Sequence, residues 1–338
     1  MDYYYNMKKN KIKKLFLFLC FISLSFHLYA RGAEDNSANL TIYGLKGSPG
    51  VGMIRLFEDP PKIPGFNVKM EALAQADLMA ARFISGEVKL GILPPNLAAK
   101  IFSSGRDIKA AAVIGNGMVS LISSDPAVRS LEDLRGKSVE VAGQGATPDY
   151  VFQRILRHHG LVPGVDVGLN YSLAPPEIAQ SLIVGRVSIA LLPEPFSTMA
   201  YLGKPDLKSI ADIQQEWAAS IGTGNTPGNY PGYYPMTLLV VDGSFASENP
   251  GAVNEIMTRV KNSIEWVTSH PIEAGALVEK HELGLKAAVA AAAIPKSNYV
   301  FIPAIEARPS LEALFNLFLE NSPASIGGTL PGDKFYLK

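Results

Sequence analysis

The sequence predicts an α/β protein of two lobes, each a sheet flanked by helices, with two extended segments crossing between the lobes. The first observation behind this prediction is an internal repeat, because residues 42–97 align without a gap with residues 141–196. The second is that short apolar segments alternate with amphipathic ones inside each copy. Strands that alternate with helices form parallel sheets covered on both faces, so two copies of such a unit predict two α/β lobes.

The identical pairs in this alignment fall mainly on residues that end strands and helices. Examples are Gly44 with Gly143, Pro49 with Pro148, Gly86 with Gly185, and Leu93-Pro94 with Leu192-Pro193. Any two strand–helix–strand units share some of these turn residues, which is the alternative explanation. A common register over the whole segment favours a repeated unit.

Each copy is expected to contain three strands and two intervening helices in the same order. The expected strands are residues 40–43, 66–73 and 88–93 in the first copy, and residues 138–142, 167–173 and 187–192 in the second. Gly86 and Gly185 are expected to end the second helix of each copy, because glycine tolerates the positive φ found after many helices.

Two further extended segments are expected to connect the lobes. They are residues 108–124, interrupted by Gly115-Asn116-Gly117, and residues 230–241. Helices are expected at residues 250–269, 274–293 and 309–320, and we expect them to return to the first lobe. The expected division is a first lobe of residues 37–116 plus 245–338 and a second lobe of residues 117–244. Two extended crossings between two lobes form a hinge.

Residues 1–30 are expected to be a secretory signal peptide that is no part of the fold. A lysine-rich run from Lys8 to Lys14 precedes an apolar stretch from Leu15 to Leu28, and the small residue Ala30 follows. This order of regions is typical of a secretory signal, and the stretch is shorter than the roughly 20 residues that span a bilayer. An uncleaved anchor is the alternative, and Met7 is an alternative start. The mature protein is therefore expected in the periplasm or at the extracytoplasmic membrane face.

The composition excludes several classes of function. The chain has 338 residues, 47% of them hydrophobic, and its formal net charge is zero, which leaves no basic footprint for a nucleic acid. The single cysteine, Cys20, lies in the expected signal, so the mature chain has no disulfide, Cys-ligated metal or thiol nucleophile. No His-x-x-x-His spacing occurs. We expect no metal, no cofactor, no nucleic-acid partner and a monomer.

A ligand site is expected where the first strand of each copy ends. Ser48-Pro49 in the first copy matches Thr147-Pro148 in the second, and a hydroxyl residue before proline suits the N-cap of a helix. The preceding turns, Lys46-Gly47 and Gln144-Gly145-Ala146, allow a ligand to approach the backbone, and two helix N-termini favour an anionic or electron-rich group. The alternative is that both pairs are ordinary helix caps.

Four more residues are candidates for the ligand site. Asn96 and Glu194 follow the third strands, Asn116 lies in the first crossing, and Tyr233 lies near the second. The polar side chains offer hydrogen bonds, and the tyrosine offers a stacking face. The alternatives are solvent-exposed turn residues and a packing tyrosine.

Several segments carry a resemblance to a known family. They are residues 45–50 (LKGSPG), the segment from Ala76-Asp77 through residues 85–88 (SGEV) to Pro95-Asn96, residues 131–137 (LEDLRGK) and residues 192–195 (LPEP). In order and spacing they resemble the nitrate/sulfonate/taurine-type substrate-binding proteins of ABC importers, over nearly the whole mature chain. The resemblance implies the type II periplasmic binding protein fold and a solute-binding component that passes a small molecule to an ABC permease in the membrane.

The resemblance leaves the ligand open, because relatives bind nitrate, alkanesulfonates, bicarbonate, pyrimidine precursors of thiamine, or flavins. Lys46 is the only cation in the expected turns, and Glu194 suits a ligand with an N–H group or an amine. A ligand-sensing subunit of a membrane receptor would have the same fold and is an alternative function. An enzyme is a further alternative, through a carboxylate pair of Glu194 with Glu71 or Asp149, although no nucleophile elbow or phosphate-binding loop occurs.

Overall fold

The computed structural model describes residues 37–222 and 232–338, so the expected signal peptide lies outside the described residues. Of the described residues, 39–63, 67–222 and 232–338 belong to one compact unit, which contains both sheets apart from Ala38 and Phe66. Within the described ranges, no helix is long and apolar enough to cross a membrane.

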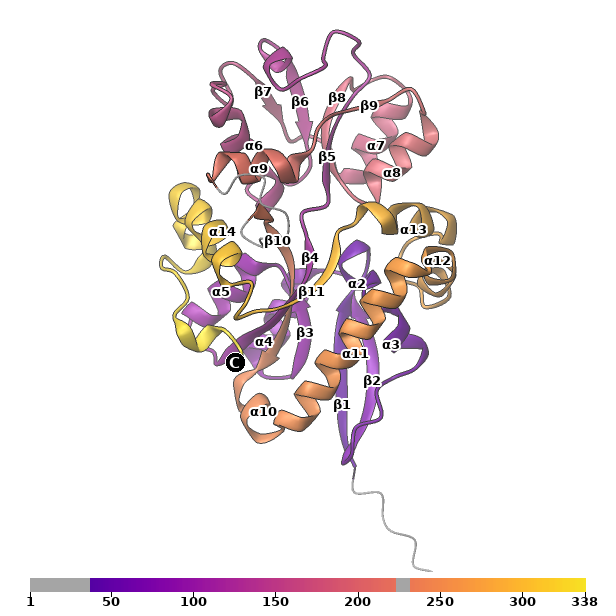
Figure 1. Cartoon of the computed structure of the whole chain (residues 1–338), viewed down its shortest axis with the longest axis vertical. Coiled ribbons are helices and arrows are strands. Elements are labelled where there is room, and N and C mark those ends of the chain that lie inside the picture. The colour runs from indigo at the N-terminus through magenta and orange to yellow at the C-terminus, as the bar shows by residue number, and fades with distance from the viewer. Residues whose placement is uncertain (1–36, 223–231) are drawn as a thin grey trace, which may run out of the picture. The chain divides into compact units, whose positions relative to one another are not determined.

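The first lobe is built on a six-stranded sheet in the order β11-β4-β10-β3-β1-β2 (Figure 1). Its strands are β1 (Ala38–Leu45), β2 (Phe66–Leu73), β3 (Leu90–Leu93), β4 (Ile108–Asn116), β10 (Pro235–Asp242) and β11 (Tyr299–Pro303). Strand β3 is parallel to β1, whereas β10 is antiparallel to both β3 and β4. All four residues of β3 (LGIL) are buried, as in a strand covered on both faces.

The second lobe is built on a five-stranded sheet in the order β7-β6-β8-β5-β9. Its strands are β5 (Val119–Ser123), β6 (Ser138–Val141), β7 (Gly168–Asn170), β8 (Ile189–Pro193) and β9 (Lys208–Ala211). Strands β7 and β8 are both parallel to β6, and β5 is antiparallel to both β8 and β9.

The two sheets repeat the same arrangement of strands. The three strands of the first copy are ordered β2-β1-β3, and those of the second copy are ordered β7-β6-β8. In each sheet the next strand is antiparallel, namely β10 beside β3 and β5 beside β8. Two α/β lobes with one topology are what the sequence repeat predicts, so this prediction is confirmed.

The crossings between the lobes differ in part from the expectation. Strand β4 ends in the first sheet at Asn116, and only Gly117 and Met118 separate it from β5 in the second sheet. The return crossing lies between helix α9 (Ile213–Ser220) and β10, a stretch that includes the undescribed residues 223–231. Strand β10 belongs to the first sheet because it pairs with both β3 and β4, whereas the sequence placed residues 117–244 in the second lobe.

Helices flank both sheets. Those whose chain neighbours are first-lobe strands are α2 (Ser48–Val51), α3 (Ile54–Glu58), α4 (Ala76–Ser85), α5 (Pro95–Ser103), α10 (Gly243–Glu248), α11 (Pro250–Ser269), α12 (Pro271–Lys280), α13 (Ala287–Ala293) and α14 (Arg308–Asn321). Those of the second lobe are α6 (Thr147–His158), α7 (Pro175–Ile183), α8 (Phe196–Gly203) and α9. Short 3-10 helices occur at Glu132–Leu134, Ile294–Lys296, Pro323–Ile326 and Asp333–Phe335.

The C-terminal helices contain one break that the sequence did not predict. Helices α11 and α14 lie where they are expected, but the expected helix of residues 274–293 is two helices, α12 and α13. Glu282 and Gly284 both have positive φ, 54° and 87°, so the helix cannot continue through them. Residues 283–286 of the loop that results line a cavity.

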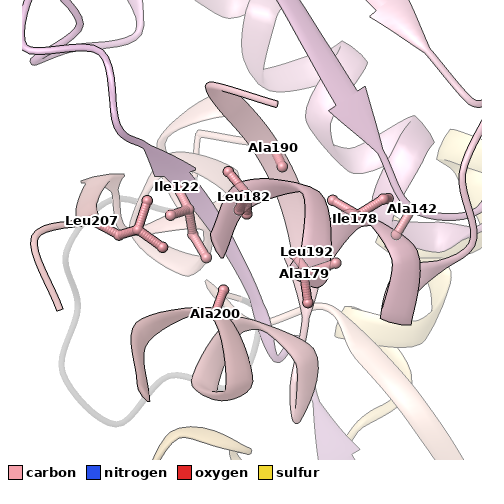
Figure 2. Close-up of a cluster of buried hydrophobic side chains, with 9 residues drawn as sticks. All are labelled: Ile122, Ala142, Ile178, Ala179, Leu182, Ala190, Leu192, Ala200 and Leu207. Atoms are coloured by element: carbon pink, nitrogen blue, oxygen red, sulfur yellow. The ribbon is translucent and has the colours of Figure 1, made fainter. Parts of the chain in front are cut away.

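A compact apolar cluster holds part of the second lobe together (Figure 2). It joins Ile122 of β5 and Leu192 of β8 to Ile178 and Leu182 of α7 and to Ala200 of α8. Each of these five side chains is fully buried. The cluster therefore fixes the end of β8 and the start of α8, the segment that carries Glu194.

Candidate ligand-binding site

A cavity of about 740 Å³ has walls from both lobes. The first lobe contributes the turn after β1, one residue of β10 and the loop and helix after α12, and the second lobe contributes the ends of β8, α7 and α8. The lining residues are Lys46, Gly47, Ser48, Pro49, Met118, Pro176, Pro193, Glu194, Pro195, Phe196, Met199, Met236, Leu283, Gly284, Leu285, Lys286 and Val289. The volume lies within the range of roughly 300–1,000 Å³ that small-molecule sites occupy.

Most of the cavity wall is apolar. Three methionines, Met118, Met199 and Met236, come from the first crossing, α8 and β10, and Phe196 and Leu283 add further apolar surface. Methionine side chains are flexible and polarizable, so they adapt to the shape of an apolar ligand.

Glu194 is the only carboxylate among the lining residues, and it is 4% exposed. Its Oε2 accepts a hydrogen bond of 3.2 Å from the backbone N–H of Thr198, so one oxygen caps the first turn of α8. Its Oε1 is buried and has no hydrogen-bond partner among the described residues. A buried carboxylate oxygen without a partner is unfavourable, and the hydroxyls of Ser197 and Thr198 in the same turn also have no partner among the described residues.

The first-lobe side of the cavity is fixed by a hydroxyl pair. Tyr299 donates a hydrogen bond of 2.9 Å to the carbonyl oxygen of Ser48, and its hydroxyl oxygen lies 2.9 Å from Ser48 Oγ. Ser48 Oγ also lies 3.2 Å from Met118 Sδ. The hydroxyl of Ser48 is therefore already satisfied inside the protein and holds the turn in place.

The negative charge of Glu194 affects the pKa of one tyrosine in each lobe. Burial raises the pKa of Tyr299 to about 12; hydrogen bonds with Ser48 and Ser297 oppose the shift, and the negative charge of Glu194 adds to it. Burial also raises the pKa of Tyr201 on α8; a hydrogen bond with Ser209 opposes this shift, and the charge of Glu194 again adds to it. The carboxylate of Glu194 thus acts on a tyrosine from each lobe.

The two copies do not contribute equally to the cavity. Of the predicted site residues, Lys46, Gly47, Ser48, Pro49 and Glu194 line it, whereas Asn96, Asn116, Gln144, Gly145, Ala146, Thr147 and Tyr233 do not. Asn116 is buried, and its backbone N–H donates to Asn298, while Tyr233 is 43% exposed. The helix start of the first copy thus lines this cavity, whereas that of the second copy does not.

Asp149 explains why the second helix start differs. Its Oδ2 accepts a hydrogen bond of 2.8 Å from the backbone N–H of Gly145, and its Oδ1 accepts 2.8 Å bonds from Gln153 and from Tyr171. A carboxylate of the protein itself thus occupies the position at the start of α6 where an anion was expected.

The prediction that Ser48 and Thr147 are N-caps is wrong. Helix α2 begins at Ser48 after Gly47, helix α6 begins at Thr147 after Ala146, and neither cap makes a side-chain hydrogen bond. The proline is consequently the second helical residue, which its fixed φ still allows. The amide N–H of Gly47 donates to the carbonyl oxygen of Leu283 at 2.7 Å and is not available to a ligand.

The structure adds lining residues that the sequence did not suggest. They come from the crossing (Met118), from α8 (Met199), from β10 (Met236) and from residues 283–289. The one sequence signal for the last group is Gly284, a glycine inside an otherwise helical pattern. Apolar lining residues give no such signal, because the same residue types fill the core.

The lobes contact each other near the cavity. Lys296 of the first lobe lies over the ring of Tyr201 of the second lobe at 5.1 Å. Elsewhere, the ring of Tyr150 on α6 meets the edge of Phe318 on α14 at 5.5 Å, and Arg154 forms an ion pair of 3.3 Å with Glu320. The two lobes thus contact each other in at least two places among the described residues.

The carboxylate pair needed for an enzyme does not form in the cavity. Glu71 lies on β2 in an ion pair of 3.4 Å with Arg82, and Asp149 is engaged at the start of α6. Within the described residues there is no group of three or more His, Cys, Asp and Glu that could hold a metal ion.

Comparison with known proteins identifies the fold. No family model matches the chain. No curated protein matches it at a significant level. Solved structures do match, among them an ABC transporter from Parabacteroides distasonis with 23% identity, a TM-score of 0.75, and coverage of 89% of this chain and 99% of that one.

Two further solved structures belong to the same group of folds. The periplasmic aliphatic sulphonate binding protein SsuA from Escherichia coli has 18% identity and a TM-score of 0.68, and the match covers 89% of this chain and 92% of that one. The periplasmic nitrate-binding protein NrtA from Synechocystis PCC 6803 has 12% identity and a TM-score of 0.52, with 75% and 69% covered.

The chain thus has the two-lobed α/β fold of the periplasmic binding proteins that serve ABC transporters. This is the fold that the sequence resemblance implied, and that prediction is confirmed.

Proposed function

We propose that the protein is the extracytoplasmic solute-binding component of an ABC importer, and that it binds a small molecule in the cavity between its lobes. The observation that carries the proposal is the cavity itself, because its walls come from both lobes and include one buried, incompletely bonded carboxylate. In this fold, the lobes are joined by strands that allow hinge closure around a ligand. The similar solved structures, which include sulphonate- and nitrate-binding proteins, support the same role.

The ligand classes that the sequence left open are a sulfonate, nitrate or taurine-like solute and a small nitrogen heterocycle such as a vitamin precursor. In either case the partner is an ABC permease in the membrane, which receives the solute from the loaded protein. No step of this function requires catalysis, and the cavity offers one carboxylate where the enzyme alternative needs two.

The test is to identify what the cavity retains. The mature protein is purified from its own organism under native conditions and then denatured, and mass spectrometry identifies the released small molecules. The variant Val289→Trp places a large side chain in the cavity wall, whereas Ile272→Trp changes a residue that is 76% exposed on α12 and does not line the cavity. A solute retained by the wild type and by Ile272→Trp, but not by Val289→Trp, supports binding in the cavity.

The transport step needs a separate measurement. The retained solute and the purified protein are added to proteoliposomes that contain a candidate ABC permease and its ATPase from the same organism. Uptake that requires both the protein and ATP supports the importer role. Equal retention by Val289→Trp, or uptake that is independent of the protein, contradicts the proposal.

A further inference from the structure

The cavity is much larger than a small inorganic anion, and most of its wall is apolar. Its volume is about 740 Å³, whereas one molecule in liquid water occupies about 30 Å³. An ion only a few times larger than water would leave most of the space filled with solvent against Met118, Met199 and Met236. Water held against such a wall is unfavourable, because apolar surface is stabilised by contact with other apolar groups.

The groups that would hold an anion are also few. Lys286 lines the cavity, but it is paired with Glu279 at 2.9 Å and its side chain is 83% exposed. The N–H of Gly47 is bonded to Leu283, and helix α2 has only four residues, too few for a strong positive end. Lys46 remains as the one lining cation with no ion pair among the described residues, and it is exposed.

Glu194 places a buried negative charge in the cavity wall, opposite in sign to Lys46 and Lys286. Glu140, another buried glutamate of the same lobe, has the partners that Oε1 of Glu194 lacks. Oε1 of Glu140 accepts hydrogen bonds from the N–H and the hydroxyl of Ser172, both at 3.0 Å, and from the N–H of Leu173 at 3.1 Å. Oε1 of Glu194 has no partner among the described residues, although the side chain is equally buried. A donor from outside the chain would complete its bonding.

From these observations we infer that the ligand is an organic nitrogen compound, an amine or an N–H heterocycle on an apolar body. Its N–H group donates to Glu194 Oε1, and its body packs against the methionine and leucine side chains of the wall. A charge-assisted hydrogen bond inside an apolar cavity is strong, so this one contact selects the head group of the ligand. The inference rests on the proposed function and narrows the ligand classes that it leaves open.

The test compares head groups on a constant body. The probes are 2-phenylethylamine, 2-phenylethanol and 2-phenylethanesulfonate, and the three corresponding cyclohexyl compounds, with affinity measured by titration calorimetry. For at least one of the two apolar bodies, phenyl or cyclohexyl, we expect the amine to bind most tightly and the sulfonate to bind most weakly. Glu194→Gln is expected to weaken amine binding by about 10- to 100-fold and to leave alcohol binding nearly unchanged, because it removes one charged acceptor.

A matched control separates ligand binding from helix capping. Glu177 also caps a helix of the second lobe, since its Oε2 accepts from the N–H of Ala174 at 2.8 Å, but it does not line the cavity. Glu177→Gln is therefore expected to bind all six probes as the wild type does. Circular dichroism and the melting temperature establish that each variant is folded.

Lys46→Ala gives a second, independent readout should Glu194→Gln fail to fold. Removal of this cation is expected to raise amine affinity, because it takes a like charge out of the cavity wall, and an unchanged or lower amine affinity contradicts the inference. Tighter binding of a sulfonate than of the matching amine, unchanged amine affinity in Glu194→Gln, or the failure of both amines to bind at millimolar concentration overturns it. Sulfonate binding without amine binding leaves the proposed function standing, whereas a cavity that binds no probe and retains no solute removes both.

Discussion

Gly117, at the crossing between the lobes, offers the sharpest test of the packing. Its N–H donates to the carbonyl oxygen of Tyr234 at 2.9 Å, and its own carbonyl oxygen accepts from the side chains of Gln214 at 2.7 Å and of Asn298. A Cβ atom added here would lie 2.0 Å from Gln214 Nε2 and 2.1 Å from Tyr234 Cζ, well below the 3.0 Å that real Cβ contacts respect. Gly117→Ala therefore forces a neighbour to move.

The size of the effect follows from how little these neighbours can move. Tyr234 is fully buried, and its ring packs edge-on against Trp217 at 5.9 Å, which is fully buried as well. Overpacking at a site of this kind typically costs about 1–3 kcal/mol of folding free energy. Because each kcal/mol lowers the melting temperature of a domain of this size class by about 2–4 °C, we expect a decrease of roughly 2–12 °C.

The assay is thermal unfolding by calorimetry, together with urea unfolding at 25 °C. Gly251→Ala is the control, because Gly251 lies in the first turn of α11 and a Cβ there meets nothing within 4 Å. Alanine at this helical position is expected to be neutral or to stabilise by up to about 1 kcal/mol. If Gly117→Ala melts with the wild type, the crossing is not tightly packed and the reasoning fails.

Two further predictions concern buried or paired polar groups. Tyr299→Phe leaves the carbonyl oxygen of Ser48 without its donor and should lower the free energy of unfolding, measured in urea, by about 1–3 kcal/mol. Tyr336→Phe should be neutral or stabilising, since the buried hydroxyl of Tyr336 has no partner among the described residues. Equal effects of the two substitutions would contradict this prediction. Burial lowers the pKa of His159, but its hydrogen bonds with Glu132 and Glu216, both 2.7 Å long, outweigh it and raise the pKa above the ordinary value of 6.5. The raised pKa means that this stabilisation is fully present below pH 6.5 and is lost as the pH rises through the folded-state pKa. A hydrogen bond with His159 is also the main reason that the pKa of Glu132 falls to about 2, so its contribution is present above 4.5 and is lost as the pH falls towards 2. Urea unfolding of wild type and His159→Gln from pH 4 to pH 9 should therefore show a loss of stability above pH 6.5 in the wild type alone, and parallel curves for the two proteins would refute the prediction.

The fold was predictable because the sequence repeats its turns. The identical pairs place Gly86 and Gly185 after corresponding helices, and both have the expected positive φ, 82° and 75°. Once these turns set the register, the order β2-β1-β3 in one sheet and β7-β6-β8 in the other follows from parallel connections. The position of β10 did not follow, because pairing with β3 and β4 is a long-range choice that no local pattern records.

The candidate site was predictable only where polar residues end a strand. Glu194 and the turn of residues 46–49 fall at such ends, and they line the cavity. Thr147 has the same local pattern, but Asp149 turns back onto Gly145 and occupies that helix start. Met199 and Met236 carry no local signal, since a methionine that faces a ligand and one that faces the core look alike in a sequence.

The position of β10 in the first sheet determines which lobe can complete its sheet first during synthesis. The strands of the second sheet all lie between Val119 and Ala211, so that lobe has every strand once the chain has reached this point. In the first sheet, β10 separates β3 from β4, and these two strands have no shared neighbour until residues 235–242 arrive. The first sheet therefore stays incomplete until β10 has been synthesised, which happens after all strands of the second lobe. Pairings between segments so distant in the sequence form slowly.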